Sequence, residues 1–463
     1  MKRDRRQRFR FHRAARALLA EATDAASYRS VAAQVKYPVG AMLVAQTVLT
    51  FGLTAVLSRL LGSRSFGEYA VILTIAGIFR LLASFPVEMG IPKFIAEGRH
   101  EGIEQVKSHY AAGIWTRLTA SFIALAVAGL LGPWLSRLYG ISGMASAVFV
   151  ASVGLCLLGP LSFFFLSCIQ GLERPVKWST ASLISSLAVF PFAAVGAAGF
   201  ARWGQFGMLL WIASGWLLAV FICAWYARRE LGFLWGRLDI ARIRILIPFL
   251  FPLWMGGLVS FGAHTILKSY LAVKCGPIPV GQFEIGITLL FHMGTIHQAF
   301  MIVFLPAWAR RYAARDGADL LRSFAQARGV LAGIATVYGL VLALAGHWVV
   351  PAIFGPEQAG AVPTVRMMGL VMPLMILSWV SSVTYVVGNR TGFAGRANLL
   401  WFCIVVPTGF LLIPSLGSFG AAIAFLLAYI AFTWYCVTRA RPFFREAERW
   451  ARQQEVAEGA VSG

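Results

Sequence analysis

The sequence predicts an all-α polytopic membrane protein, with about twelve transmembrane helices in two pseudo-symmetric lobes of six. Of its 463 residues, 59% are hydrophobic and only 13% are charged, whereas a soluble protein carries about a quarter charged residues. Apolar runs of about 20 residues, the length that a helix needs to cross a bilayer, recur along the whole chain. In addition, glycine landmarks of the first half return in the second half.

The repeated landmarks indicate an internal duplication. Gly62 and Gly67 lie between the first two apolar runs, and Gly276 and Gly281 each follow 214 positions later. Three further pairs keep nearly the same offset: Gly132 with Gly346 (214), Gly171 with Gly388 (217) and Gly204 with Gly417 (213). Five pairs in the same order are typical of a repeat, and six spans in each copy give the two lobes the same orientation. We interpret the glycine stretch as the tight turn between the first two helices of each lobe, because glycine readily adopts positive φ.

The apolar runs place the elements along the chain. The predicted spans are 38–58, 69–88, 110–131, 146–168, 179–200, 206–226, 248–271, 282–305, 328–350, 364–386, 397–414 and 418–438. They define a basic N-terminal arm (1–37), a first lobe (38–227), a linker (228–247), a second lobe (248–438) and a C-terminal tail (439–463). The linker alternates arginine with apolar residues, which is typical of a helix lying in the membrane interface.

The net charge of +22 gives the orientation of the chain. With both termini in the cytoplasm, 31 of the 41 Lys and Arg fall in inner segments and five in outer loops, as the positive-inside rule requires. These charges are spread over short loops and form no continuous basic face, so we expect no nucleic-acid partner. The basic arm has two open interpretations: a helix lying on anionic lipid, or a tail that only fixes orientation.

The sequence carries no signature of an enzyme or of a cofactor site. The six cysteines have no metal-ligand spacing, and the sequence has neither a Walker-type phosphate loop nor an HExxH motif. The predicted outer loops are too short to form a catalytic domain. We therefore expect no catalytic residue, no metal and no cofactor.

Basic side chains within the predicted spans are the candidate functional residues. A charge inside a membrane costs about 3 kcal/mol or more and usually faces a bundle interior or water. Arg80 lies near the middle of the second span, and Lys268 lies in the outer part of the seventh. The other candidates for substrate contact are Arg59, Arg117, His264, His292 and His297. A buried histidine is more often a core residue than a ligand contact, so this alternative stays open for each of the three histidines.

The acidic residues nearest to these bases are Glu68, Glu88 and Glu284, and all three lie near span ends. We therefore expect Arg80 and Lys268 to lack acidic partners. Unpaired bases in a cavity favour an anionic ligand such as a phosphate or diphosphate, which arginine can bind with two parallel hydrogen bonds.

Several segments resemble bacterial polysaccharide-unit flippases. The stretch 59–69, with Gly62 and Gly67, is similar to the first loop of Wzx-type transporters of the multidrug/oligosaccharidyl-lipid/polysaccharide (MOP) exporter superfamily. The stretch 88–96, with Glu88 and Gly90, resembles the segment that follows their second span. Segments 304–306, 353–357 and 388–390 look like landmarks of their second half.

This resemblance covers residues 38–440 and has implications for fold and function. It implies a V-shaped, two-lobe bundle in the bacterial cytoplasmic (inner) membrane, with a cavity lined by spans one, two, seven and eight. It implies transport of undecaprenyl-diphosphate-linked oligosaccharides for O-antigen, capsule or exopolysaccharide synthesis, with the polymerase and chain-length machinery as further partners. For the four residues Gly62, Gly67, Glu88 and Gly90 it implies roles in a gate or loop.

Three other functions remain as alternatives. A drug exporter of the same superfamily would be expected to carry acidic residues for cationic substrates. A polytopic glycosyltransferase, polymerase or ligase would be expected to need a sizeable outer loop or a catalytic carboxylate. A structural scaffold would not explain an arginine at the middle of the membrane.

Overall fold

The computed structural model describes residues 40–462, apart from 42, 46, 173, 234, 235, 237, 238, 389 and 391. Nearly every described residue is helical, and none of them lies in a strand, so the predicted all-α class is confirmed. The predicted arm 1–37 lies outside the described residues. The elements in order are η1 (Thr47–Gly52), α2 (Leu53–Ala83), α3 (Val87–Glu101), α4 (Ile103–Leu138), α5 (Ala145–Val153), η2 (Gly154–Leu158), α6 (Gly159–Gly171), α7 (Pro175–Ala198), α8 (Phe200–Leu231), α9 (Ile240–Cys275), α10 (Pro277–Ala313), α11 (Gly317–Phe354), η3 (Pro356–Ala361), α12 (Val362–Val387) and α13 (Gly392–Ser462).

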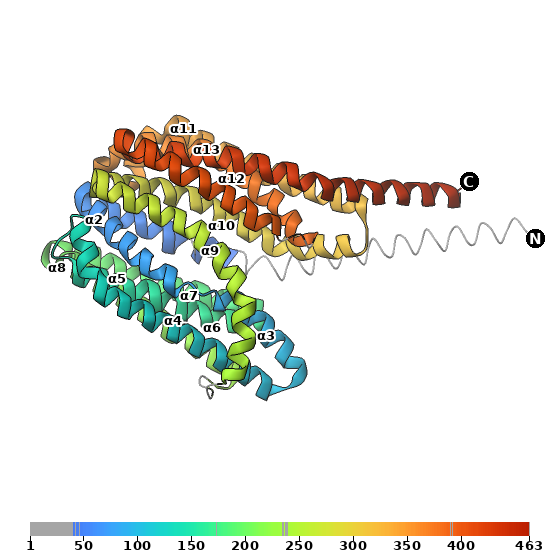
Figure 1. Ribbon diagram of the computed structural model, residues 1–463, viewed down its shortest axis with the longest axis horizontal. Coiled ribbons are helices and arrows are strands. Elements are labelled where there is room, and N and C mark those ends of the chain that lie inside the picture. Colours follow the sequence, from blue (N-terminus) through green and yellow to red (C-terminus); the bar gives the residue numbers. More distant parts are fainter. Residues whose placement is uncertain are drawn as a thin grey trace, which may run out of the picture.

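The helices form two bundles (Figure 1). Helices α2–α8, coloured blue to green, make one bundle, and α10–α13, coloured yellow to red, make the other. Helix α9 connects them and packs on α2 and α4 of the first bundle as well as on α10 and α13 of the second. The bundles meet at the left of the view and diverge toward the end where the C-terminus projects. This is the two-lobe, V-shaped arrangement that the sequence predicts.

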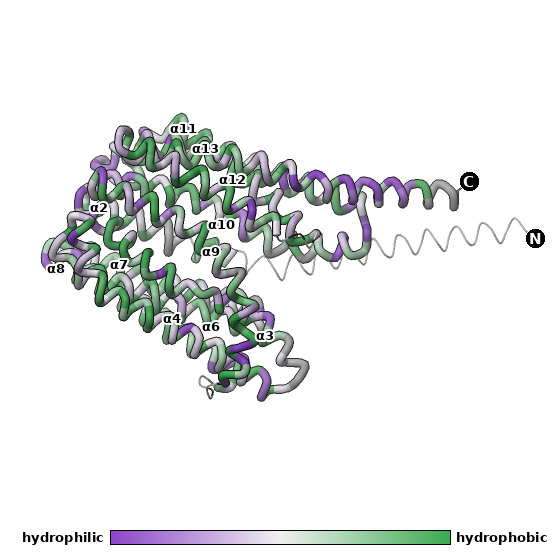
Figure 2. The backbone as a smooth tube through the Cα atoms, viewed as in Figure 1, coloured by the Kyte–Doolittle hydropathy of each residue, from purple (hydrophilic) through white to green (hydrophobic). Residues whose placement is uncertain are grey.

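Eight described helical segments are long and apolar enough to cross a membrane, or nine if the bent pair Ile240–Phe251 and Trp254–Cys275 counts as one span. Apolar residues cover most of both bundles, whereas polar residues gather at their ends and along the projecting end of α13 (Figure 2). Two segments, Leu53–Ala96 and Gly392–Val456, have 44 and 65 residues, more than the roughly 20 that one crossing needs. The exact number of twelve spans therefore stays a prediction.

The backbone angles of the paired glycines agree with the predicted duplication. Gly62 has φ 70° and ψ 171°, and its counterpart Gly276 has φ 81° and ψ −173°. Gly204 and Gly417 have φ 59° and 56° and interrupt α8 and α13. Side chains disfavour this positive-φ region, so glycine allows the same chain reversal in both halves.

The connection between the bundles follows the predicted linker in part. Helix α8 continues to Leu231, and α9 begins at Ile240 with a segment bent by 51° from its longer part. Asp239 caps this start, because its carboxylate accepts hydrogen bonds from the backbone N–H of Arg242 at 3.2 Å and from the hydroxyl of Ser108 at 2.7 Å. Both bonds lower the pKa of the Asp239 carboxyl, and the bond from Ser108 contributes most. The start of the linker helix is thus tied to α4 of the first bundle.

Candidate functional site: a charged cavity between the bundles

A cavity of about 730 Å³ lies between the two bundles, within the range of about 300–1,000 Å³ that is usual for small-molecule sites. Helix α2, Ser84 and Leu155 of η2 line it from the first bundle, and α9, α10, α12 and α13 supply the other lining residues. Three of its lining residues carry a formal charge: Arg80, Lys268 and Glu284. With two positive charges and one negative, the wall has a net charge of +1.

Arg80 is the cavity charge contributed by the first bundle. It lies in the last turn of α2, where the helix dipole favours a positive charge. Its guanidinium carbon is 5.8 Å from the centre of the Phe261 ring on α9, a cation–π distance. In the part of the chain that the structure describes, Arg80 makes no ion pair and no hydrogen bond. The position and the missing acidic partner agree with the expectation for an anion-binding residue.

Lys268 differs from the sequence-based expectation. Its ammonium group forms an ion pair with Glu284, and the two side chains are 17% and 18% exposed. The expectation that Lys268 lacks an acidic partner is therefore wrong. The reason is the turn at Gly276: Lys268 lies eight residues before it and Glu284 eight residues after it, so the antiparallel helices α9 and α10 bring the two side chains together.

His264 is the one candidate histidine that lines the cavity. It lies one turn before Lys268 on α9. Its Nδ1 donates a hydrogen bond to the carbonyl of Ser260 at 2.8 Å, which leaves Nε2 as the acceptor. This Nε2 is buried and has no partner among the described residues.

The other two histidines are placed outside the cavity wall. His292 Nε2 contacts the hydroxyl of Thr47 at 3.1 Å, which joins η1 to α10. His297 is 8% exposed, and its ring lies 5.4 Å from that of Trp379. Substrate contact by either residue has no support in this geometry.

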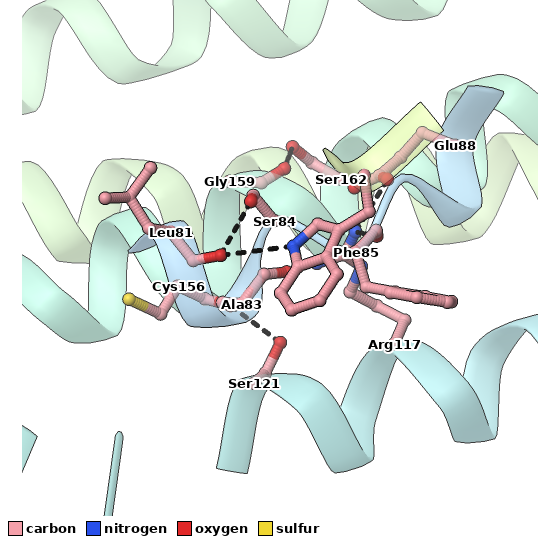
Figure 3. A network of polar contacts seen from close by, with 11 residues as sticks. Leu81, Ala83, Ser84, Phe85, Glu88, Arg117, Ser121, Cys156, Gly159 and Ser162 are labelled. Atoms are coloured by element: carbon pink, nitrogen blue, oxygen red, sulfur yellow. Dashed lines mark hydrogen bonds and ion pairs between the residues drawn. The ribbon is translucent and has the colours of Figure 1, made fainter. Parts of the chain in front are cut away.

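Arg117 is also outside the cavity, and its guanidinium is used within the first bundle (Figure 3). Helix α2 ends at Ala83 and α3 begins at Val87. Pro86 in the break has no N–H to donate, so carbonyl groups are left without helical partners. Arg117, which is 1% exposed, donates to the carbonyls of Ala83 and Phe85 and pairs with Glu88 at 2.6 Å. Its geometry indicates that it holds the broken second span together.

Arg59 and the glycines of the two repeated turns, Gly62, Gly67, Gly276 and Gly281, lie where the two bundles meet, a region that we name the closed end. It consists of residues 59–69 of the first bundle and residues 276–281 and 352–358 of the second. Arg59 Nε donates to the carbonyl of Ile353 at 2.7 Å, and its NH2 donates to that of Ala352. Arg59 therefore bridges the bundles and does not line the cavity.

The two repeated turns face each other at the closed end. A Cβ on Gly67 would lie 2.4 Å from the carbonyl oxygen of Pro277, and one on Gly281 would lie 3.1 Å from the Cα of Gly67. A Cβ on Gly62 would meet the carboxylate of Glu357 at 2.5 Å. The absence of side chains thus permits close backbone contact between the lobes. Gly90, on α3, allows a similar approach of Leu250 on α9.

A model of the family described as "Polysaccharide biosynthesis protein" matches residues 39–273, about half of the chain, including all of the first bundle and nearly all of α9. The chain belongs to this family. No curated protein matches its sequence. The predicted resemblance to MOP-superfamily polysaccharide transporters is confirmed, and this polysaccharide biosynthesis protein is a multi-pass membrane protein.

Solved structures of MOP-superfamily transporters share its fold. An inward-facing multidrug resistance MATE family transporter has a TM-score of 0.70 at 14% identity, and the match covers 86% of this chain and 95% of that one. The lipid II flippase MurJ in an inward closed conformation has a TM-score of 0.61 at 11% identity, covering 92% and 90%. The eukaryotic MATE transporter AtDTX14 has a TM-score of 0.61 at 13% identity, covering 92% and 99%.

Sequence reasoning missed part of the cavity wall. Residues of α12 and α13, among them Trp379, Asn398 and Trp401, line it beside the predicted spans. Tryptophans in apolar runs look like core or interface residues. The available signal was an asparagine within an apolar run, because an uncharged amide in a membrane span needs hydrogen-bond partners.

Proposed function

We propose that this protein is a flippase that moves undecaprenyl-diphosphate-linked oligosaccharides from the cytoplasmic to the outer leaflet of the inner membrane. The product would serve O-antigen, capsule or exopolysaccharide synthesis. The observation that carries the proposal is the position of Arg80, an unpaired arginine in the cavity between the lobes of a polysaccharide biosynthesis protein. A base within a membrane span that has no counter-ion favours an anionic ligand.

Arg80 and Lys268 would hold the diphosphate from opposite sides. Arg80 comes from the first bundle, whereas Lys268 comes from α9, which packs against the second. Glu284 pairs with Lys268, so of the charged residues described in the cavity wall Arg80 alone has no counter-ion. The diphosphate would bind Arg80 first and then compete with Glu284 for Lys268. Each charged hydrogen bond to the phosphate would contribute about 1.5–3 kcal/mol.

Transport would proceed by alternating access. The bundles diverge toward the end where the C-terminus projects (Figure 1), and we assign that end to the cytoplasm because most loop charges lie there. The cavity would then load from the inner leaflet. Release on the other side requires the closed end to separate, which means breaking contacts such as those of Arg59 with Ile353 and Ala352.

Drug export is the second candidate, because the fold is also that of MATE transporters and the cavity contains one carboxylate, Glu284. Export of an organic cation would require Glu284 to be free, whereas it is paired with Lys268. The net positive charge of the lining residues opposes binding of a cation. These features favour the flippase.

Export of surface polysaccharide by cells tests the proposal. Arg80→Ala and Lys268→Ala should each reduce export about ten- to a hundredfold at unchanged protein level in the membrane, since each loses one charged hydrogen bond to phosphate. Arg80→Lys should restore part of the activity, because lysine keeps the charge but loses the planar fork. Arg328→Ala is the matched control: Arg328 is exposed on α11 and does not line the cavity. Normal export by both cavity variants would overturn the proposal.

A further inference from the structure

The second bundle contributes its own residues to the cavity wall, from α10, α12 and α13. Five of these residues are aromatic. Asn398 and Gln298 add two amide groups to the same wall. The aromatic residues are Phe291, Trp379, Trp401, Tyr429 and Phe432.

Two polar atoms in this wall have no partner. Trp401 is only 5% exposed, and its Nε1 donates to no described residue. His264 Nε2 is likewise unpartnered, because Nδ1 uses its proton on the Ser260 carbonyl. The rings of His264 and Trp401 lie 5.1 Å apart between centres, at an angle of 31°. Two neighbouring rings therefore carry a buried donor and a buried acceptor without partners among the described residues, and burial of unpaired polar groups is unfavourable.

A hydroxyl group fits this pair, because it can accept from the indole N–H and donate to the imidazole nitrogen at the same time. A phosphate oxygen fits it less well, since a phosphate dianion only accepts. The aromatic side chains supply flat apolar faces beside the pair, and the amides of Asn398 and Gln298 can donate and accept further bonds. A ligand with many hydroxyl groups on an otherwise apolar ring matches all of these features.

We propose that the second-bundle end of the cavity is a carbohydrate subsite. In this subsite a sugar hydroxyl bridges Trp401 Nε1 and His264 Nε2, and the sugar ring packs on the aromatic wall. The inference rests on the proposed flippase function and locates the sugar that is attached to the diphosphate. His264 lies one helical turn, about 6 Å along the axis, from Lys268. A sugar linked directly to a diphosphate held by Lys268 would therefore reach it.

The subsite separates two recognition tasks. Arg80 and Lys268 would bind the diphosphate, which every substrate of this kind shares. Trp401, His264 and Asn398 would bind the sugar, so selection between oligosaccharides would belong to the second bundle.

Binding measurements on the purified full-length protein test the subsite. The probes are bare undecaprenyl diphosphate and the same lipid carrying glucose, galactose or N-acetylglucosamine. The native protein should bind at least one glycosylated probe about five- to tenfold more tightly than the bare lipid, since one net hydrogen bond contributes about that factor. Trp401→Phe and His264→Phe should each abolish most of this preference and leave affinity for the bare lipid unchanged.

Controls separate this inference from the proposed function. Trp348→Phe alters an exposed tryptophan of α11 outside the cavity and should keep the sugar preference. Asn398→Ala, at a half-buried position, provides a further test if a ring substitution impairs folding. Arg80→Ala should weaken binding of bare and glycosylated lipids equally.

Two distinct results would be negative. If Arg80→Ala leaves binding of every probe unchanged, the diphosphate site and the proposed function fail. If Arg80→Ala weakens binding but the native protein has no sugar preference, or Trp401→Phe, His264→Phe and Asn398→Ala all retain it, the carbohydrate subsite is overturned.

Discussion

At the residue scale, the bases within the predicted spans have different environments, which their partners define. Arg117 is surrounded by carbonyl groups and a carboxylate of its own bundle. Lys268 has one acidic partner in the cavity, and Arg80 lies over an aromatic ring with no acidic partner in the described part of the chain. Residue type and depth in the span do not distinguish these three environments, whereas their hydrogen-bond partners do.

Replacement of Glu284 tests whether this carboxylate competes with the ligand. Glu284→Gln keeps the shape of the side chain but removes the counter-ion of Lys268. The variant should bind bare undecaprenyl diphosphate about two- to fivefold more tightly than the native protein, the factor expected from losing a half-buried ion pair worth up to about 1 kcal/mol. Equilibrium binding to the purified protein measures this. Weaker binding by the variant would mean that Glu284 helps to hold the ligand.

Replacement of Arg117 tests its structural assignment. Arg117→Ala leaves the carbonyls of Ala83 and Phe85 unpaired and leaves Glu88 with an uncompensated charge. Breaking a buried ion pair in this way typically costs about 3–5 kcal/mol, so the thermal unfolding midpoint and the protein level in the membrane should fall clearly. Arg80→Ala should change neither. A stable Arg117→Ala variant that has lost transport would instead assign Arg117 to substrate contact.

At the element scale, the turns and breaks of the helices decide where polar groups meet. The turn at Gly276 brings Lys268 opposite Glu284, and the break before α3 creates the binding site for Arg117. The repeated glycines and the apolar runs could be predicted from sequence because both are local patterns. The Lys268–Glu284 ion pair and the contacts of Arg117 could not be predicted, since they depend on the register of neighbouring helices and on side-chain direction.

The contact between the repeated turns gives a prediction about the closed end. Gly67→Ala would place a Cβ 2.4 Å from the backbone oxygen of Pro277. This distance is shorter than van der Waals contact, and backbone atoms cannot move aside without a large cost. The variant should therefore favour separation of the closed end. Spin labels at Arg64 and Glu357, measured by double electron–electron resonance, should show a longer distance distribution than in the native protein.

Gly329→Ala is the control for this experiment. Gly329 lies in α11, and an added Cβ there has no heavy atom within 4 Å. The distance distribution between the two spin labels in the Gly329→Ala variant should match that of the native protein. A Gly67→Ala distribution identical to the native one would show that the glycine contact does not control this end.

At the scale of the whole molecule, two bundles enclose a cavity with a positive net charge. The sequence was sufficient to predict the membrane class, the two lobes and the position of Arg80 and Lys268 in the cavity wall. Composition and the spacing of the apolar runs carry these features. It was not sufficient to predict the aromatic wall in α12 and α13. Tryptophan and phenylalanine in an apolar span have the same local pattern whether they face a core or a cavity.

The orientation of the whole molecule is testable by cysteine labelling. In a background without the six native cysteines, single cysteines replace Arg64, whose side chain is 85% exposed at the closed end, and Ala318, which is exposed at the α10–α11 turn. An impermeant thiol reagent added to intact spheroplasts should label position 64 and not position 318. The opposite pattern would reverse the membrane orientation and the assignment of the loading side.

The most direct test of the central claim is lipid movement by the purified protein in liposomes. The substrate is undecaprenyl-diphosphate-N-acetylglucosamine, and an impermeant enzyme that modifies this sugar reports how much has reached the outer leaflet. The native protein and Arg328→Ala should move the lipid, whereas Arg80→Ala and Lys268→Ala should be at least about tenfold slower. If the native protein leaves the lipid in place but transports a quaternary ammonium dye, or if Arg80→Ala and Lys268→Ala both move the lipid at the native rate, the cavity does not translocate a diphosphate through these bases.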